Sequence, residues 1–351
     1  MRIDANLLPD TLAAAEAQAR EAEAAGYQGI WCGEAAHDAF LTVSAVARGT
    51  TRVTVGTAIV VAFARSPMTV AYQANDLQLY AQGRFVLGLG TQVRPHIERR
   101  FSMPWSAPAR RMREYVAALR AIWRSWQTGE RLDFRGDLYS HTLMTPFFSP
   151  GPNPYGPPPV VLAAVGERMV RVAGEVADGL IVHPFTSADY LRDRIRPALT
   201  GPLSERGRTL ADFTVILSGM VATGEDEVAL ARAVEAVRGR IAFYASTPAY
   251  RPVLAQHGWE AVGEELTRLS RLDSPDRWDR MRRLVDDRML HTFAIVAPPE
   301  QVPAAVLDRF GGLVDRFSLN VPYDLDPLLI NRIAAELARQ AEARTRKEAG
   351  A

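Results

Sequence analysis

A glutamate and a histidine three positions apart, Glu34 and His37, are the residues of this sequence best placed for acid–base chemistry. They follow a short apolar run that ends at Gly33. A histidine with an ordinary pKa of about 6.5 exchanges a proton at neutral pH, and a carboxylate one turn earlier can orient its ring. We predict that His37 transfers a proton with the help of Glu34. The alternative is a histidine that caps or packs at the next helix start, beside Asp38.

The residues that several other kinds of catalysis require are absent from the sequence. The six histidines show no HxH or HExxH spacing, and Glu34 is the only acidic residue among the predicted strand ends, so no metal site is predicted. Lys347 is the only lysine and lies near the C-terminus, which excludes chemistry that needs a buried lysine nucleophile. Neither a GxSxG elbow nor a P-loop is present, and Val93 replaces the third glycine of a dinucleotide fingerprint. These absences favour an organic redox cofactor.

Eight short apolar runs alternate with longer amphipathic stretches, which is typical of a parallel sheet built from βαβ units. We therefore predict one α/β domain over residues 1–351, a TIM (β/α)₈ barrel with its active site at the C-terminal ends of the strands. Two insertions are expected, a loop with a hairpin over about 132–159 and a mostly helical segment over about 246–297, and 342–351 is expected to be a flexible tail. The predicted strands are Arg2–Leu7, Gly29–Gly33, Val53–Val61, Phe85–Gly90, Val160–Ala164, Gly179–His183, Phe213–Ala222 and Arg316–Val321.

Composition restricts the partners and the compartment. The chain has 41 basic and 40 acidic side chains, a net charge of +1, and no basic stripe, so neither nucleic acid nor a membrane surface is an expected partner. No apolar run approaches the roughly 20 residues of a membrane-spanning helix. The single cysteine, Cys32, fits a reducing cytoplasm. We expect a cytoplasmic enzyme that acts on a small molecule.

Small side chains cluster at the predicted strand ends. Such residues let a flat ligand approach the backbone closely, or they fill the taper of a tight barrel. These residues are Gly33, Ala58, Gly88, Gly90, Ala163 and Ala164.

Motifs along nearly the whole chain resemble those of the luciferase-like flavin and deazaflavin barrel superfamily. In the first half these are Ile30-Trp31-Cys32-Gly33-Glu34, Val55-Gly56-Thr57-Ala58-Ile59 leading to Ser66-Pro67, and Gly83-Arg84-Phe85-Val86-Leu87-Gly88-Leu89-Gly90-Thr91. Further on they are Gly166-Glu167-Arg168-Met169, Ala177-Asp178-Gly179 and Pro299-Glu300-Gln301-Val302. Within the superfamily, Arg94–Phe101 and Thr142–Phe148 resemble a subgroup usually assigned to coenzyme F420.

The resemblance implies where a cofactor would bind. Its ring would touch Glu34, Ala58, Ile59, Thr91 and Gln92, with His96 nearby, and its phosphate tail would lie over Ala164, Val165, Gly166, Glu167 and Arg168. The glycine of this loop opens a helix, whose free N–H groups suit an anionic phosphate. The resemblance also implies a cis peptide bond between the third-strand alanine and isoleucine, and a homodimer.

The activity that the resemblance implies is hydride transfer between coenzyme F420 and a small organic substrate. Ala35 and Val93 stand where related sugar-phosphate dehydrogenases carry histidine and glutamate, so a sugar phosphate is not the expected substrate. One alternative is an FMN-dependent monooxygenase, although a dianionic FMN phosphate usually meets two or more cations and Arg168 is the one clear candidate. A second alternative is a barrel that binds a flavin without catalysis. Arg94, Arg99 and Arg100 would receive the polyglutamate of F420.

Overall fold

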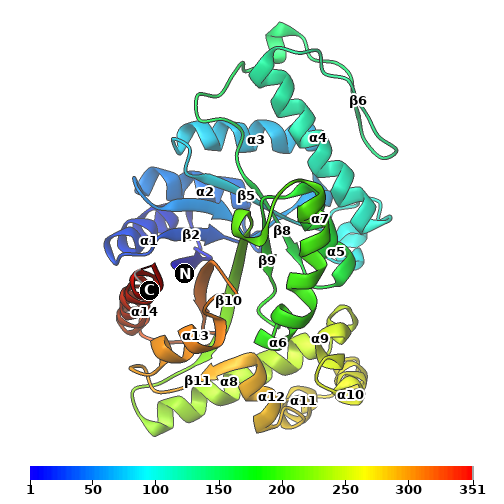
Figure 1. Ribbon diagram of the computed structural model, residues 1–351. Helices are drawn as coiled ribbons and strands as arrows, with labels where there is room; N and C mark the ends of the chain where they lie inside the picture. Colours follow the sequence, from blue (N-terminus) through cyan, green and yellow to red (C-terminus); the bar gives the residue numbers. More distant parts are fainter. Residues whose placement is uncertain (350–351) are drawn as a thin grey trace.

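Eight parallel strands close into a barrel in the computed structural model, which describes residues 1–349 (Figure 1). The order around the barrel is β1-β2-β3-β5-β8-β9-β10-β12, and β12 pairs with β1 to close it. The predicted fold is therefore confirmed. The barrel strands are β1 (Arg2–Leu7), β2 (Gly29–Cys32), β3 (Thr54–Thr57), β5 (Phe85–Gly90), β8 (Val160–Ala164), β9 (Gly179–Val182), β10 (Thr214–Ala222) and β12 (Arg316–Asn320).

The third predicted strand is interrupted. A cis peptide bond between Ala58 and Ile59 separates β3 from the two-residue strand β4 (Val60–Val61), which pairs with the end of β5. This bond confirms the prediction made from the family resemblance.

The segment over about 246–297 is mostly helical and ends in a short strand that was not predicted. Ala294–Val296 form a further parallel strand of the sheet, β11, which pairs with the end of β10. Because the strand has only three residues and follows helix α12 (Asp287–Phe293) without a break, its apolar residues read as a continuation of the helical pattern.

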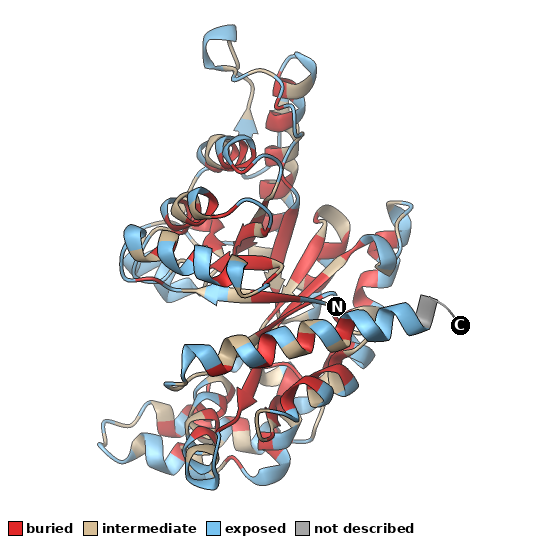
Figure 2. Ribbon diagram, turned by 90° about the vertical axis from the view of Figure 1, so that its left-hand side faces the viewer, coloured by how far each residue is buried: buried red, intermediate tan, exposed pale blue. Residues whose placement is uncertain are grey.

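Helices cover the outside of the barrel, and the first three begin at polar capping residues. The side chains of Thr11, Asp38 and Ser66 accept hydrogen bonds from backbone N–H groups at the starts of α1, α2 and α3. Buried residues on these helices face the strands, and exposed ones face outward (Figure 2). The α-helices outside the second insertion are α1 (Leu12–Ala24), α2 (Ala39–Gly49), α3 (Pro67–Tyr80), α4 (Pro108–Thr128), α5 (Glu167–Val176), α6 (Ala188–Tyr190), α7 (Arg196–Glu205), α8 (Glu227–Ala245), α13 (Val302–Phe310) and α14 (Pro327–Ala349).

The two insertions lie at opposite ends of the molecule (Figure 1). The first contains an antiparallel hairpin of β6 (Phe134–Arg135) and β7 (Ser140–His141), as expected. The second contains α9 (Arg251–Ala255), α10 (Glu260–Ser270), α11 (Arg277–Arg283) and α12. The expected tail differs from the structure, because residues 342–349 continue helix α14, while 350–351 lie outside the described residues.

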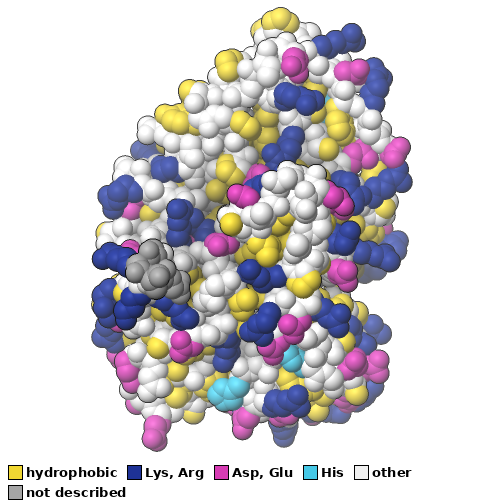
Figure 3. All heavy atoms as spheres, viewed as in Figure 1, with side chains coloured by type: hydrophobic (Ala, Val, Ile, Leu, Met, Phe, Trp, Pro, Cys, Tyr) yellow, Lys and Arg dark blue, Asp and Glu magenta, His cyan; other side chains and the backbone are white. Residues whose placement is uncertain are grey.

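Basic and acidic side chains are interspersed on the face shown in Figure 3. Within residues 1–349, none of the helices has the length and apolarity that a membrane span requires.

Candidate functional site

The interior of the barrel is built in layers. Asp4 accepts two hydrogen bonds from Arg316 at 2.7 and 2.8 Å and one from the indole N–H of Trp31 at 2.8 Å, and all three side chains are buried. Arg316 and Asp4 therefore neutralise each other inside the barrel. Beside them lies an inner apolar cluster of Trp31, Val161 and Ile216, against which Ala58, Val86 and Ile181 pack.

The next layer toward the C-terminal ends of the strands is polar and uncharged. Side chains alternate between the two faces of a strand, so Asn6 points to the same side as Asp4. The amide of Asn6 donates to the hydroxyl oxygens of Ser218 at 2.9 Å and Ser318 at 2.7 Å. Asn6 is exposed and Ser218 partly so, which shows that the barrel is open here. The sequence analysis missed this layer, because its three residues come from strands far apart in the chain.

Two glycines on β5, Gly88 and Gly90, leave room for neighbouring atoms of the third strand. A Cβ on Gly88 would lie 1.8 Å from the carbonyl oxygen of Thr57, and one on Gly90 would lie 2.8 Å from the side chain of Ile59. The Thr57 hydroxyl also donates to the Gly88 carbonyl and accepts from its N–H group, each at 2.8 Å. At these two positions the structure favours tight packing around the interrupted third strand over space for a flat ligand.

Glu34 is held by an arginine that the sequence analysis did not assign to the site. Its side chain is 6% exposed and accepts two 2.9 Å hydrogen bonds from Arg65 and one of 2.8 Å from the N–H of Val61. Arg65 also donates to Asp38 at 2.7 Å. The backbone N–H of Glu34 donates to the carbonyl of Ile59, so the loop after β2 is fastened to the residues that flank the cis bond.

His37 stands apart from this cluster. Its side chain is exposed, and none of the hydrogen bonds in the described part of the chain joins it to Glu34. The helix start beside it is capped by Asp38, which accepts from the N–H groups of Phe40 and Leu41. The orienting role predicted for Glu34 therefore has no counterpart in this geometry, and neither does a capping role for His37.

The loop after β5 carries the next predicted contacts. Thr91 and Gln92 are partly exposed, and Gln92 has a positive φ of 56° although it is not glycine. His96 is exposed and begins the π-helical turn η2 (His96–Arg100). Arg94 pairs with Glu98 within this segment, and Arg100 donates to the carbonyl of Ala35 at 2.9 Å. The loops after β2 and β5 are thus joined.

The loop after β8 leads into α5 without a capping side chain. Gly166 is its N-cap, and a Cβ there would meet nothing within 4 Å. Ala164 is buried, Val165 is partly exposed, and Glu167 and Arg168 are exposed. Within residues 1–349, neither Arg168 nor Arg171 forms a hydrogen bond or an ion pair, so this helix start has free backbone donors and free cations.

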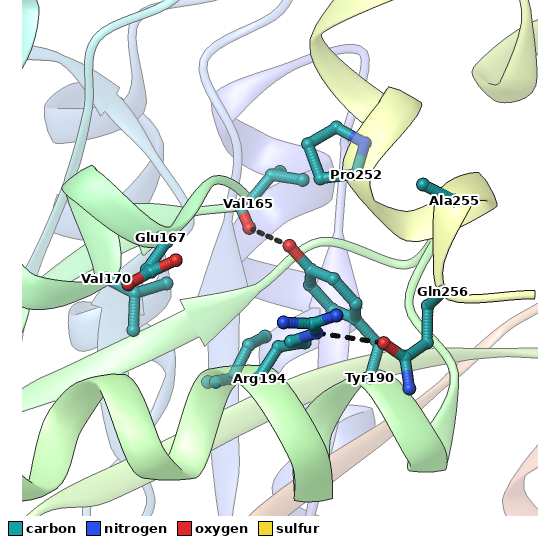
Figure 4. A pocket seen from close by; sticks show the side chains of 9 residues that line it. Val165, Glu167, Val170, Tyr190, Arg194, Pro252, Ala255 and Gln256 are labelled. Atoms are coloured by element: carbon teal, nitrogen blue, oxygen red, sulfur yellow. Dashed lines mark hydrogen bonds between the residues drawn. The ribbon is translucent and has the colours of Figure 1, made fainter. Parts of the chain in front are cut away.

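Cavities adjoin this loop on two sides. One of about 300 Å³ lies between the loop, α6 and α9, where the hydroxyl of Tyr190 donates to the Val165 carbonyl at 3.2 Å and Arg194 donates to Gln256 at 3.0 Å (Figure 4). The other, of about 740 Å³, lies between the start of α4 and residues 166–171. A ligand group at Gly166 could therefore extend in either direction.

His183 directly follows β9 (Gly179–Val182), at the C-terminal end of that strand. Its ring stacks on Tyr250 of the second insertion, with centroids 4.4 Å apart, and its Nε2 lies 3.0 Å from the Tyr250 hydroxyl. The N–H of Phe185 donates to Nδ1. Burial lowers the pKa of His183 to about 4 and raises that of Tyr250 to about 12, so both are uncharged at neutral pH.

The barrel strands from β1 to β10 and the loops after β2, β5 and β8 lie within a segment that matches one protein family. Residues 2–316 match the family model described as luciferase-like monooxygenase. The chain belongs to this family.

Two curated relatives of this luciferase-like protein show its range of similarity. It is 51% identical over 316 residues to the uncharacterized protein Rv1360 of Mycobacterium tuberculosis, covering 90% of this chain and 92% of the relative. It is 29% identical over 277 residues to an F420-dependent glucose-6-phosphate dehydrogenase of Beutenbergia cavernae, covering 76% and 79%. Among solved structures, the F420-dependent tetrahydromethanopterin reductase from Methanopyrus kandleri has a TM-score of 0.77 at 18% identity, covering 97% of this chain and 99% of that one.

Proposed function

We propose that this luciferase-like protein is an F420-dependent oxidoreductase that transfers a hydride between coenzyme F420 and a small organic substrate. Family membership and the F420-dependent relatives support an oxidoreductase of this kind. The finer assignment to F420 rests on the loop after β8.

The observation that carries the proposal is the open start of α5. A free helix N-terminus with an unpaired arginine, Arg168, is suited to a phosphodiester. F420 continues past its phosphodiester into a long lactyl and polyglutamate tail, and the cavities on both sides of Gly166 leave room for such a continuation. The residues present therefore fit F420, with Gly166, Glu167 and Arg168 at its phosphodiester.

In this proposal the ring of the cofactor lies against Ala58, Ile59, Thr91 and Gln92. When bound, the deazaflavin supplies a hydride donor or acceptor. The protein then has to orient the ring and handle a proton. Glu34 and its arginine partner would hold the third-strand bulge in place, since they fasten it to the loop after β2. His37 would exchange the proton, since its side chain is exposed and engaged in no hydrogen bond of the described chain.

An FMN-dependent monooxygenase is the second candidate. Arg171 lies one helical turn after Arg168, is also unpaired, and lines the same cavity, so two cations are available for a dianionic phosphate. Arg65 and Arg94, two arginines distant in the sequence that could otherwise converge on an FMN phosphate, form ion pairs with Glu34 and Glu98 instead.

A thermal unfolding screen separates these candidates. At a hundredfold excess over its Kd, the true cofactor stabilises the fold by about 2.7 kcal/mol. We expect F420 to raise the unfolding midpoint of the purified chain, and FMN, FAD and NADPH to raise it less or not at all. A shift with FMN alone would support the monooxygenase. No shift with any of the four would support a barrel without a redox cofactor.

A further inference from the structure

The hydrogen bonds around His183 determine which of its nitrogens carries the proton. The N–H of Phe185 donates to Nδ1 at 3.0 Å, so Nδ1 must be an acceptor without a hydrogen. The ring is neutral at neutral pH because burial lowers its pKa. Its single proton therefore lies on Nε2, which faces the Tyr250 hydroxyl at 3.0 Å.

This tautomer sets the direction of the next hydrogen bond. Because Nε2 donates to the phenol oxygen of Tyr250, the phenol's own proton is free to be donated elsewhere. The stacked rings, with an interplanar angle of 29°, and the edge contact from Tyr244 at 4.7 Å hold both side chains in place. Both members of the pair are partly exposed, so a ligand can reach them.

The surroundings of this donor contribute no charge that acts on it. Burial lowers the pKa of His183, and burial together with the phenol of Tyr244 raises that of Tyr250, so no charged side chain contributes to either shift. Arg240 lies 5.8 Å from the ring centroid of Tyr244, and within residues 1–349 no cation–π contact or ion pair joins a cation to His183 or Tyr250. A phosphate or carboxylate would therefore meet no cation paired with these two side chains, whereas a neutral oxygen would find a donor.

We infer that His183 and Tyr250 form a substrate-binding site in which the Tyr250 hydroxyl donates a hydrogen bond to the carbonyl or hydroxyl oxygen of an uncharged substrate. This inference rests on the proposed function, since it names the substrate class of the same barrel mouth. It also assigns a role to the second insertion, which brings Tyr250 over the end of β9.

The test uses the full chain without cofactor, so that it does not depend on F420 binding. Cyclohexanone serves as the neutral probe and phenyl phosphate as the anionic one, and binding is followed by the ¹⁵N resonances of His183, assigned by comparison with His183→Gln. We expect a neutral ring protonated on Nε2, and a saturable shift with cyclohexanone but not with phenyl phosphate. Tyr250→Phe keeps the stacked ring and should weaken cyclohexanone binding about five- to tenfold, the effect of one neutral hydrogen bond.

Tyr244→Phe is the matched control. It removes a hydroxyl from the other ring that touches His183, and that hydroxyl makes no hydrogen bond in the described chain, so probe binding should stay unchanged. Protonation on Nδ1, stronger binding of phenyl phosphate, no saturable shift with cyclohexanone, or equal effects of the two variants would overturn the inference. F420 affinity measured separately on the same variants should be unaltered, which keeps a failure here distinct from a failure of the proposed function.

Discussion

Arg65 donates two hydrogen bonds of 2.9 Å each to the carboxylate of Glu34, and these bonds link the loop after β2 to the segment that follows the interrupted third strand. Both side chains are largely buried, at 14% and 6% exposure. A third hydrogen bond, from the N–H of Val61, joins that of Arg65 on Oε2, so both carboxylate oxygens are engaged. In the proposed function, the glutamate would therefore act on the cofactor site through the backbone that it holds in place.

Replacing Arg65 should lower the free energy of unfolding far more than replacing an arginine on the surface. Arg65→Leu leaves the buried Glu34 charge without its partner, and we expect a loss of about 3–5 kcal/mol in the free energy of unfolding. Arg94→Leu is the control, because Arg94 also pairs with a glutamate but is 67% exposed, so its loss should cost less than about 1 kcal/mol. Urea denaturation measures both. Similar small losses in the two variants would contradict the structural role of Arg65.

Gly88 should tolerate no side chain. In Gly88→Ala the new methyl group would collide with the Thr57 carbonyl oxygen, and we expect a loss of about 3 kcal/mol or more, or failure to fold. Gly239→Ala in α8 adds the same methyl group where nothing lies within 4 Å, and should stabilise the protein by up to about 1 kcal/mol. Circular dichroism melts of the two variants check this, and a well-folded Gly88→Ala would show that the strands can separate.

Stability should depend on the protonation of His183 at acidic pH. Its pKa is about 4 in the folded protein, where burial disfavours the charged ring, and about 6.5 when unfolded. Between these values the unfolded chain binds more protons, so the contribution is fully present above about pH 6.5 and is lost as the pH falls toward 4. The stability difference between the wild type and His183→Gln should therefore shrink over this range. A difference that stays constant with pH would be inconsistent with a His183 that is neutral in the folded protein.

His37 should affect turnover without affecting cofactor binding. We expect His37→Asn to lower the turnover number at least about tenfold, because general acid–base catalysis typically contributes about a hundredfold or more. His291→Asn, on α12 of the second insertion, serves as the control and should leave turnover unchanged. Steady-state kinetics with any carbonyl substrate that the enzyme reduces, together with F420 affinity, measures both effects. Unchanged turnover in His37→Asn would transfer the proton role to His96 or His183.

Most of the eight barrel strands could be predicted from the sequence because they are short, largely apolar runs, a purely local pattern. In β1 and β12 polar and apolar side chains alternate instead, which is also a local strand pattern. The cis bond at Ala58 could be predicted only from the family motif, since those residue types carry no local sign of it. Strand β11 escaped prediction because three apolar residues directly after a helix continue the helical pattern.

The site was less predictable than the fold, because its contacts join residues far apart in the chain. Glu34 was identified, but Arg65, 31 positions later, decides what its carboxylate does. Tyr250 reaches His183 across 67 positions from an insertion that has no periodic relation to the strands. Arg65 directly follows the apolar run Val60–Ala64, and this isolated position was the one signal that could have indicated its ion pair with Glu34.

The measurement that tests the central claim most directly is an equilibrium titration of the purified apoprotein with F420 and with FMN. We predict micromolar binding of F420 that weakens as salt is added, and that weakens in Arg168→Ala but not in Arg192→Ala, an exposed arginine already paired with Asp189. Tight binding of FMN, with no binding of F420 at comparable concentrations, would contradict the account and identify the monooxygenase instead.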